Sequence, residues 1–452
     1  MTISILGAGL SGLSCSSFIG HERCQIFEKN SYAGGHIATH TQNGCYWDEG
    51  PHVSFTKHQK VRDLLTESTI GGLLEYPAIV GNWYQGSWIP HPAQSNLYAV
   101  PRPLADRCLE DFLNSRPPQA APSEAPPVHY GEWLEQAFGK TFAETFSAAY
   151  TRKYWTCNPN QMSVDWVGER VFKPDVETVR SGYHQPPKDN THYITTVRYP
   201  VSGGFSSIAD GISKGSRVNF DHDVSSIDFD AGVIEFANGK FYDFEFLINT
   251  IPLVEFVSKI KGVPVEILQA CEQLSCSSLL LVNIVSETPS PHPYHWLYVY
   301  DETMYSTRIS QTHLLSQAST PPGQAGIQVE VYSSRYRPFT ESHEKISQRV
   351  LEEVQIMGLA EKPIAMSTQF IPYANIICDL PRRQALNHVL GWLEGVGLIR
   401  EHDDLQPMTD WTKASKAPTR PKLALAGRFA QWKYFWTDDC ILRAEQLASA
   451  YR

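Results

Sequence analysis

The start of the chain has a hydrophobic pattern that predicts a strand, a helix and a second strand. Residues 3–6 form a short apolar segment, and residues 24–27 form another. Between them lies a stretch of small residues in which Leu13 and Phe18 are apolar. Short apolar segments bounded by glycine are typical of buried strands in parallel sheets. This part of the chain therefore predicts the beginning of an α/β fold.

The remaining chain mixes strand patterns with helix patterns. Strands are expected where apolar residues alternate or run together between turn residues, and helices where they recur every three or four positions. The predicted strands are 218–227 and 233–236, as hairpin strands, 243–252, as a strand returning to the first sheet, and 277–285, 294–300 and 326–332, as a second sheet. The predicted amphipathic helices are 341–358 and 382–398.

Aromatic residues predict one more helix in the middle of the chain. They recur at spacings of four or five, mostly four, at Trp133, Phe138, Phe142, Phe146 and Tyr150. Such a stripe is more typical of a core than of a cofactor site. The helix follows residues 117–127, whose five prolines exclude a helix and indicate a flexible connection.

Composition narrows the class of protein. With 452 residues, 42% hydrophobic and 19% charged, the chain is long and apolar enough to bury a large core. The net charge of -10 and the lack of a basic block argue against a nucleic-acid partner. No apolar run approaches the roughly 20 residues of a membrane span, and a strand-like start leaves no room for a signal peptide. We therefore expect a soluble, cytoplasmic protein with no membrane partner.

Cysteine and histidine patterns make metal sites and disulfides improbable. The nine cysteines are an odd number and include no C-x-x-C pair, which argues against a disulfide framework or a structural zinc site. The 16 histidines show no H-E-x-x-H pattern. We expect no metal, and the cysteine usage fits a reducing cytosol.

The first strand and helix enclose a dinucleotide-binding motif. Gly7, Gly9 and Gly12 form Gly-x-Gly-x-x-Gly directly after the first strand, and Glu28 ends the second strand. The first glycine permits a tight turn, the second lets the backbone approach a pyrophosphate, and the third lets the helix pack closely on the strand. The helix N-terminus then faces the phosphates, and the acidic side chain accepts hydrogen bonds from a ribose.

A second glycine pair favours a flavin over a nicotinamide nucleotide. Gly34 and Gly35 follow the acidic residue and precede His36. This resembles the Gly-Gly signature of flavoproteins of the amine oxidase and UDP-galactopyranose mutase superfamily, although amine oxidases usually carry arginine where His36 stands. The resemblance implies bound FAD, with the backbone near Val224 against its adenine.

Six further segments, in family order, resemble UDP-galactopyranose mutase, with most likeness to its eukaryotic-type branch. They are 48–56, which contains His52; 88–94, which contains His91 and Gln94; 150–155 with 165–171, which contain Trp155 and Arg170; 198–200 with 203–205; 295–298 with Arg308, which contain Trp296 and Tyr298; and 425–434 with 437–439, which contain Gly427, Arg428, Tyr434, Thr437 and Asp438.

The resemblance implies an activity and a role for each of these residues. The family interconverts the pyranose and furanose forms of a nucleotide-diphosphate sugar, and N5 of the reduced flavin is the nucleophile at sugar C1. Arg170 and Arg308 would bind the diphosphate leaving group, and His52 would orient and tune N5. The expected substrate-binding residues are His91, Gln94, Trp155, Trp296, Tyr298 and Tyr434. The expected flavin-binding residues at the C-terminus are Gly427, Arg428, Thr437 and Asp438.

Departures from the family pattern leave alternatives open. Phe55 stands where bacterial mutases have a second histidine, His91 where the eukaryotic type has a tyrosine, and Asp438 where an amide side chain is common. These departures leave the nucleobase and the sugar of the substrate undetermined. One alternative is an FAD-dependent oxidoreductase of the amine oxidase or protoporphyrinogen oxidase type. Another is a nucleotide-sugar-binding regulator without catalysis.

The expected architecture is a doubly wound, Rossmann-like α/β FAD-binding domain with a helical insertion and an antiparallel sheet insertion. We expect the FAD domain at 1–75, 201–256 and 418–452, the helical insertion at 99–150, and the substrate-binding sheet domain at 76–98, 151–200 and 257–417. The expected partners are a UDP-linked sugar and NAD(P)H as reductant, and the expected process is polysaccharide biosynthesis.

Overall fold

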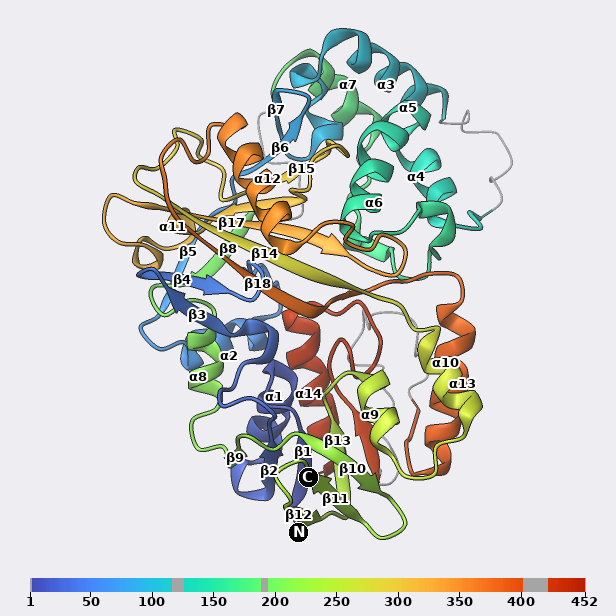
Figure 1. Ribbon diagram of the computed structural model, residues 1–452. Helices are drawn as coiled ribbons and strands as arrows, with labels where there is room; N and C mark the ends of the chain where they lie inside the picture. The colour runs from blue at the N-terminus through green and yellow to red at the C-terminus, as the bar shows by residue number, and fades with distance from the viewer. Residues whose placement is uncertain (1, 116–125, 188–193, 401–421, 452) are drawn as a thin grey trace.

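A parallel sheet forms the lower part of the molecule (Figure 1). The computed structural model describes residues 2–115, 126–187, 194–400 and 422–451. The sheet has five strands in the order β19 (Leu423–Leu425), β13 (Phe246–Asn249), β1 (Ile3–Leu6), β2 (Cys24–Phe27) and β9 (Val218–Asn219), and every neighbouring pair is parallel. Its strands come from three separate stretches of the chain. This confirms the predicted α/β class, while the domain boundaries stay a prediction.

Two helices from opposite ends of the chain pack side by side on this sheet. They are α1 (Leu10–Ile19) and α14 (Thr437–Tyr451). Ile5, Ile26 and Ile248 are fully buried between the strands and these helices. Because parallel strands are covered on both faces, their sequences are nearly continuous apolar runs, as the start of the chain shows.

A small antiparallel sheet adjoins the parallel one. Its strands are β10 (Val224–Asp228), β11 (Val233–Phe236) and β12 (Phe241–Asp243). The hairpin prediction is confirmed for 224–228 and 233–236. It is wrong for Val218 and Asn219, which pair in parallel with Ile26 and Phe27 at the edge of the large sheet. Two residues are too few for their alternation to distinguish parallel from antiparallel pairing.

A second, seven-stranded sheet crosses the middle of the molecule (Figure 1). Its order is β18 (Pro363–Ile376), β14 (Cys276–Ser286), β17 (Ala325–Ser333), β16 (Arg308–Gln311), β15 (Trp296–Val299), β6 (Val80–Tyr84) and β7 (Ser87–Pro90). The helix α12 (His343–Ile356) buries Ile346, Val350 and Val354 against it. The strands predicted at 277–285, 294–300 and 326–332 are therefore confirmed, as is the helix predicted at 341–358.

Helices gather at one end of the second sheet. They are α3 (Arg102–Asn114), α4 (Tyr130–Phe138), α5 (Lys140–Phe142), a π-helical turn (Ala143–Ala148), α6 (Ala149–Tyr154) and α7 (Val176–His184). The single aromatic helix predicted here is wrong, because the chain breaks at Gly139, where φ is 77°. A Cβ at Gly139 would lie 2.5 Å from the backbone nitrogen of Phe112. The aromatic side chains nevertheless form core, and Phe142 and Phe146 are buried.

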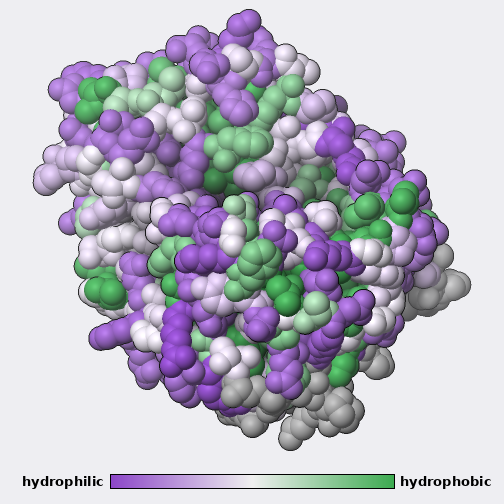
Figure 2. Space-filling model, turned by 60° about the horizontal axis from the view of Figure 1, so that its bottom comes forward, coloured by the Kyte–Doolittle hydropathy of each residue, from purple (hydrophilic) through white to green (hydrophobic). Residues whose placement is uncertain are grey.

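The other elements connect these layers. They are α2 (Gln59–Ser68), α8 (Ser206–Ile212), α9 (Leu253–Lys259), α10 (Val265–Glu272), α11 (Thr312–Leu315), α13 (Arg382–Gly395) and the pairs β3 (Thr39–Gln42) with β4 (Cys45–Asp48) and β5 (Leu73–Pro77) with β8 (Thr196–Pro200). All but the last two residues of the predicted proline-rich connection lie outside the described residues. On the face in Figure 2, hydrophobic residues lie in small patches among hydrophilic ones. Among the described helices, none has the length and apolar character needed to cross a bilayer.

Candidate active site

The turn between β1 and α1 has the geometry of a phosphate-binding loop. Gly7 has a φ of 97°, and a Cβ at Gly12 would lie 2.0 Å from the Gly7 carbonyl oxygen. Only glycine at position 12 lets the helix begin this close to the strand. No side chain caps α1, whose N-cap residue is Gly9. The first N–H groups of the helix are therefore not taken by a capping side chain, and they can bind an anion.

Glu28 lies beside this turn at the end of β2. Its carboxylate accepts hydrogen bonds from the backbone N–H groups of Ala8 at 2.8 Å and Asn30 at 2.9 Å. The side chain is buried, and Val224 lies in the same buried cluster as the neighbouring Phe27. Glu28 thus has the fixed position that recognition of a ribose requires.

The second glycine pair lies directly against the first loop. The backbone N–H of Gly34 donates to the Ala8 carbonyl at 2.9 Å, and a Cβ at Gly35 would lie 3.0 Å from the Gly9 Cα. His36 follows and approaches Glu49 at 3.7 Å. Burial raises the pKa of Glu49, but hydrogen bonds from His36 and a neighbouring histidine outweigh it and lower the pKa to about 2. The two glycine motifs, separate in sequence, therefore form one loop cluster.

The C-terminal Gly-Arg segment packs on the same helix. A Cβ at Gly427 would lie 2.6 Å from the Ser11 hydroxyl of α1. Arg428 donates from Nε to the Phe435 carbonyl at 2.7 Å and from Nη1 to Asn375 Oδ1 at 3.0 Å. Thr437 and Asp438 then begin α14. The segment thus joins the parallel sheet to the second sheet through Asn375 of β18.

His52 lies close to Arg428 and Arg308. Its ring packs on Phe205 with centroids 5.5 Å apart, and its buried Nδ1 has no hydrogen-bond partner among the described residues. Removal from solvent, with Arg428 and then Arg308 nearby, lowers the pKa of His52 to about 3. The imidazole is therefore neutral at physiological pH and offers one unused nitrogen.

Arg308 is held by a buried carboxylate on the adjacent strand. Its Nε and Nη2 donate to the two oxygens of Glu330 at 2.8 and 2.5 Å. Glu330 is 1% exposed and also accepts a hydrogen bond from Tyr332 at 2.7 Å. Nη2 of Arg308 lies 3.5 Å from the carbonyl of Pro51, the residue before His52. The fork of Arg308 is thus fixed beside the histidine loop.

Arg170 contacts the C-terminal segment. Its Nη2 donates to Asp439 at 2.8 Å, and its guanidinium carbon lies 4.1 Å from the ring centroid of Trp436 and 5.4 Å from that of Tyr434. The Nη1 atom is buried and has no hydrogen-bond partner among the described residues. A buried donor of a charged group without an acceptor is costly, so this atom is a strong candidate to bind a ligand.

A chain of contacts joins the two arginines. Tyr434 lies 5.4 Å from the guanidinium carbons of both Arg170 and Arg428. Arg428 and Tyr154 share the acceptor Asn375 Oδ1, and Tyr154 packs on Tyr332 with centroids 4.9 Å apart. Tyr332 donates to Glu330, the partner of Arg308. Residues from five distant parts of the sequence are therefore brought into one site.

Of the other predicted substrate residues, Trp155 contacts Tyr434 directly, whereas Gln94 contacts the chain elsewhere. Tyr298 accepts a hydrogen bond from Trp296 Nε1 at 3.1 Å, and its ring lies 4.9 Å from that of His91. Burial raises the pKa of Tyr298. Trp155 packs on Tyr434 with centroids 4.8 Å apart. Gln94 donates to the Phe172 carbonyl at 3.3 Å.

Comparison with known proteins identifies the family. A sequence model of the family described as flavin containing amine oxidoreductase matches residues 10–448. The chain belongs to this family. FAD is therefore the cofactor of this protein, as the glycine motifs predict.

Solved structures show the same fold. A crystal structure of reduced UDP-galactopyranose mutase is 24% identical, covers 99% of this chain and 94% of its own, and has a TM-score of 0.86. A protein from Exiguobacterium sp. 255-15, proposed to be a protoporphyrinogen oxidase, is 16% identical, with coverages of 99% and 97% and a TM-score of 0.69. Wild-type putrescine oxidase bound to putrescine is 13% identical, with coverages of 99% and 98% and a TM-score of 0.59. These likenesses confirm the predicted fold.

The residues of the loop cluster fit FAD. The uncapped start of α1 suits the pyrophosphate, and the carboxylate of Glu28 suits a ribose. Gly35 and Gly427 keep backbone close to the start of α1, because a Cβ would lie 3.0 Å from the Gly9 Cα and 2.6 Å from the Ser11 hydroxyl, respectively. Among the described residues, no group of three or more His, Cys, Asp or Glu side chains could hold a metal ion.

Several residues at the site were not singled out by their sequence pattern. Glu330 and Asp439 are the carboxylate partners of the two arginines, and Tyr154, Tyr332 and Asn375 connect them. Arg308 and Glu330 lie directly opposite each other on β16 and β17. An opposite-charge pair on neighbouring strands is a recognisable signal, but only after the strand register is known.

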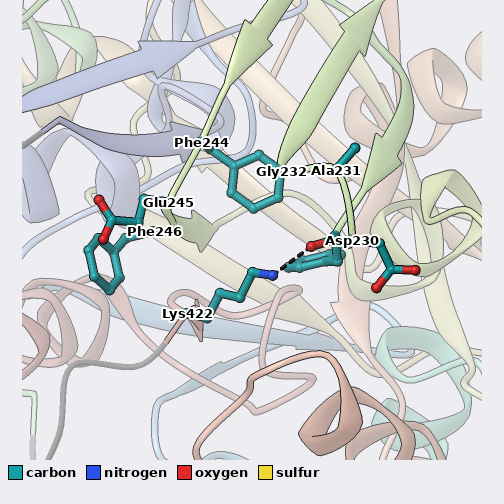
Figure 3. A pocket seen from close by; sticks show the side chains of 8 residues that line it. Asp230, Ala231, Gly232, Phe244, Glu245, Phe246 and Lys422 are labelled. Carbon is teal, nitrogen blue, oxygen red and sulfur yellow. Dashed lines mark hydrogen bonds between the residues drawn. The ribbon is translucent and has the colours of Figure 1, made fainter.

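One pocket lies away from this site. It has a volume of about 400 Å³ and is lined by residues 229–232 and 244–246 and by Lys422 (Figure 3). Lys422 closes one side by donating to the Phe229 carbonyl at 2.5 Å. The pocket adjoins the beginnings of β13 and β19, whereas the glycine loop follows the end of β1. In a parallel sheet these are opposite edges, and ligands bind at the carboxyl edge.

Proposed function

We propose that the protein is an FAD-dependent mutase that interconverts the pyranose and furanose forms of a nucleotide-diphosphate sugar, in the manner of UDP-galactopyranose mutase. The observation that carries the proposal is the convergence of Arg170 and Arg308 on one tyrosine cluster beside His52 and Arg428. Such a site suits a leaving group with two negative charges. UDP is the nucleotide we expect, and the likeness to the eukaryotic-type branch belongs to the same proposal.

The arginines would hold the leaving group from two sides. Arg308 uses Nε and Nη2 for Glu330, and Arg170 uses Nη2 for Asp439, so each fork keeps its Nη1 edge for a phosphate oxygen. Tyr298 and Tyr434 would add hydroxyl groups that keep the diphosphate close to C1 for recapture. Burial raises the pKa of Tyr298, so its hydroxyl stays a neutral donor.

His52 would orient the reaction centre without carrying charge. Its pKa of about 3 keeps the ring neutral, and its unused Nδ1 can exchange a hydrogen bond with a bound group. Reduced FAD supplies the nucleophile for sugar C1 when it is bound. Trp155 and Trp296 would exclude water from the diphosphate and sugar, with His91 and Gln94 nearer the nucleotide.

The test is turnover by the flavin-reduced protein. The purified protein should show a flavin spectrum. It should convert UDP-galactopyranose to the furanose form only after its flavin has been reduced with dithionite, and liquid chromatography measures the conversion. If the reduced holoprotein converts none of a panel of nucleotide sugars, the proposal fails. A protein that binds UDP but turns over nothing would be the regulator.

Lysine substitutions test the two arginines. Arg170→Lys and Arg308→Lys keep the charge but lose the fork, so turnover should fall about 10- to 100-fold while flavin content stays normal, because a charge-assisted hydrogen bond is worth about 1.5–3 kcal/mol. Arg349→Lys is the control, since Arg349 is exposed and pairs with Glu341 at 3.3 Å. Unchanged turnover in both active-site variants would contradict the assignment.

An oxidase is the second candidate, and the family description and the likeness to putrescine oxidase favour it. An oxidase would consume oxygen with an amine or a porphyrinogen and would not need prior reduction by dithionite. Oxygen-electrode assays with both substrate classes, beside the sugar assay, distinguish the two functions.

The remaining expectations belong to the same proposal. We propose NAD(P)H as the physiological reductant, a cytoplasmic location, a role in polysaccharide biosynthesis, and the domain division given above. Anaerobic flavin bleaching by NADH or NADPH tests the first.

A further inference from the structure

Arg382 is the fully buried arginine at the start of α13. It is 1% exposed, although arginine is almost never fully buried unless it is paired. Two of its nitrogens donate to one acceptor: Nε lies 3.3 Å and Nη2 lies 3.0 Å from the carbonyl oxygen of Trp432. The third nitrogen, Nη1, lies 3.7 Å from Asp165 Oδ2. One guanidinium group therefore connects two separate segments of the chain.

The first segment carries Tyr434. Trp432 is fully buried and has a φ of 52°, a left-handed conformation that is unusual for a large side chain. The two hydrogen bonds from Arg382 hold the carbonyl of this residue. Two positions later, Tyr434 lies 5.4 Å from the guanidinium carbons of Arg170 and Arg428. The backbone turn at Trp432 therefore determines where this tyrosine lies.

The second segment carries Arg170. Asp165 accepts a hydrogen bond from Ser163 at 2.5 Å and begins the stretch that ends in the short helix Gly168–Arg170. Trp166 fixes the same stretch by donating from Nε1 to the Ser163 carbonyl at 2.9 Å. Because Asp165 Oδ2 lies 3.7 Å from Nη1 of Arg382, this ion pair places the start of the stretch beside the guanidinium group that donates to the Trp432 carbonyl.

We propose that Arg382 is a positioning residue that sets the distance between Arg170 and Tyr434, the two groups that hold the diphosphate in the proposed function, on which this inference rests. Only a guanidinium group can donate twice to one carbonyl and still face a carboxylate with its third nitrogen. Lysine has one nitrogen at the end of a flexible chain. Because Arg382 is buried and contacts Trp432 and Asp165, its effect on the site passes through the two segments.

The neighbouring Arg383 provides a matched control. Its Nη2 contacts the same oxygen of Asp165 at 3.1 Å, but its side chain is 61% exposed. Its hydrogen bond goes to Asp165 and not to Trp432, and it is adjacent to Arg382 in the sequence. The Gln substitutions at positions 382 and 383 each remove a positive charge beside Asp165, but only the substitution at 382 removes the hydrogen bonds to the Trp432 carbonyl.

The experiment compares Arg382→Lys, Arg382→Gln and Asp165→Asn with Arg383→Lys and Arg383→Gln in the reduced holoenzyme. For the 382 variants we expect normal flavin content, a UDP dissociation constant raised severalfold and a kcat/KM lowered about 10- to 100-fold, because a displacement of about 1 Å in a positioning group costs this much. Arg382→Lys should lose less UDP affinity and less turnover than Arg382→Gln, because lysine keeps the positive charge. Asp165→Asn should weaken UDP binding less, because it leaves the bonds to Trp432 intact. The 383 variants should raise the UDP dissociation constant no more than Asp165→Asn does, because they also leave the bonds to Trp432 intact.

The outcomes separate this inference from the proposed function. If the folded, flavin-loaded 382 variants bind UDP and turn over like the 383 variants, the inference is wrong and the mutase proposal stands. If they only lose thermal stability or flavin, with an unchanged UDP dissociation constant in the loaded fraction, Arg382 is structural and the inference is also wrong. If the wild type itself does not bind UDP, the proposed function fails first.

Discussion

Gly12 offers the sharpest test of the phosphate-binding loop. A Cβ at this position would lie 2.0 Å from the Gly7 carbonyl oxygen and 3.3 Å from the Thr250 hydroxyl. Cβ atoms in proteins essentially never approach closer than 3.0 Å. In Gly12→Ala, α1 must therefore move about 1 Å from β1, because the obstructing oxygen belongs to the backbone and cannot rotate away.

The expected size of the effect follows from two opposing contributions. Alanine in a helix is normally about 1 kcal/mol more stable than glycine, whereas forced overpacking costs about 1–3 kcal/mol. The cost of overpacking should thus exceed the gain in helix propensity, and Gly12→Ala should be less stable than the wild type. The shift also moves the N–H groups that face the pyrophosphate. Losing one charge-assisted hydrogen bond, worth about 1.5–3 kcal/mol, weakens FAD binding about 10- to 100-fold.

The assay is titration of flavin-free protein with FAD, followed by flavin fluorescence, together with urea unfolding. Gly391→Ala is the matched control, since Gly391 also lies within a helix, α13, and a Cβ there meets no atom within 4 Å. Gly391→Ala should keep wild-type affinity and gain stability. If Gly12→Ala binds FAD as tightly as Gly391→Ala does, the close approach of α1 is not what builds the site.

Two further predictions concern buried polar groups. Tyr199→Phe removes a donor to the buried carboxylate of Asp48, at 2.7 Å, and should cost about 1–3 kcal/mol in urea unfolding. Tyr183→Phe, which removes an exposed contact with Asp106, should leave the unfolding curve unchanged. Burial lowers the pKa of His52 from 6.5 to about 3. Below pH 6.5 the imidazole is therefore protonated in the unfolded chain but still neutral in the folded chain. The free energy of unfolding thus falls as the pH drops from 6.5 toward 3. Between pH 7 and 5 the flavin-free wild type should therefore lose up to about 2 kcal/mol more than His52→Gln does, and equal losses would show that His52 does not titrate this way.

The sequence predicts best where neighbours along the chain also meet in space. Gly7, Gly12 and Glu28 belong to one strand–helix–strand unit, and the covalent spacing alone brings them together. The long strands β14 and β17 are equally evident, because their apolar runs are buried on both faces. For the same reason the sequence identifies a flavin loop without knowledge of the second sheet.

The sequence predicts least where a residue chooses a partner far along the chain. Arg170 and Asp439 are 269 positions apart, and their contact depends on how the last helix meets the parallel sheet. Arg382 carries no motif, and its burial becomes apparent only when α13 is placed against Trp432. The prediction of a single aromatic helix was wrong for a related reason. The rings recur at helical spacing, but the helix breaks at Gly139, where the backbone packs closely against α3. This contact involves residues far along the chain, so no local pattern predicts it.

The charges at the site bear on the choice between mutase and amine oxidase. Arg170 and Arg308 face Asp439 and Glu330, whereas Arg428 donates to a backbone carbonyl and to an amide side chain, which are neutral. Arg428 thus forms no ion pair with a carboxylate among the described residues. A primary amine is itself cationic at neutral pH, and a like charge at 4 Å costs about 4 kcal/mol at an effective dielectric constant of about 20. The same unpaired positive charge attracts a diphosphate. An amine substrate would have to overcome this repulsion, whereas a nucleotide sugar would use the attraction, and this asymmetry favours the mutase among the functions that the fold permits.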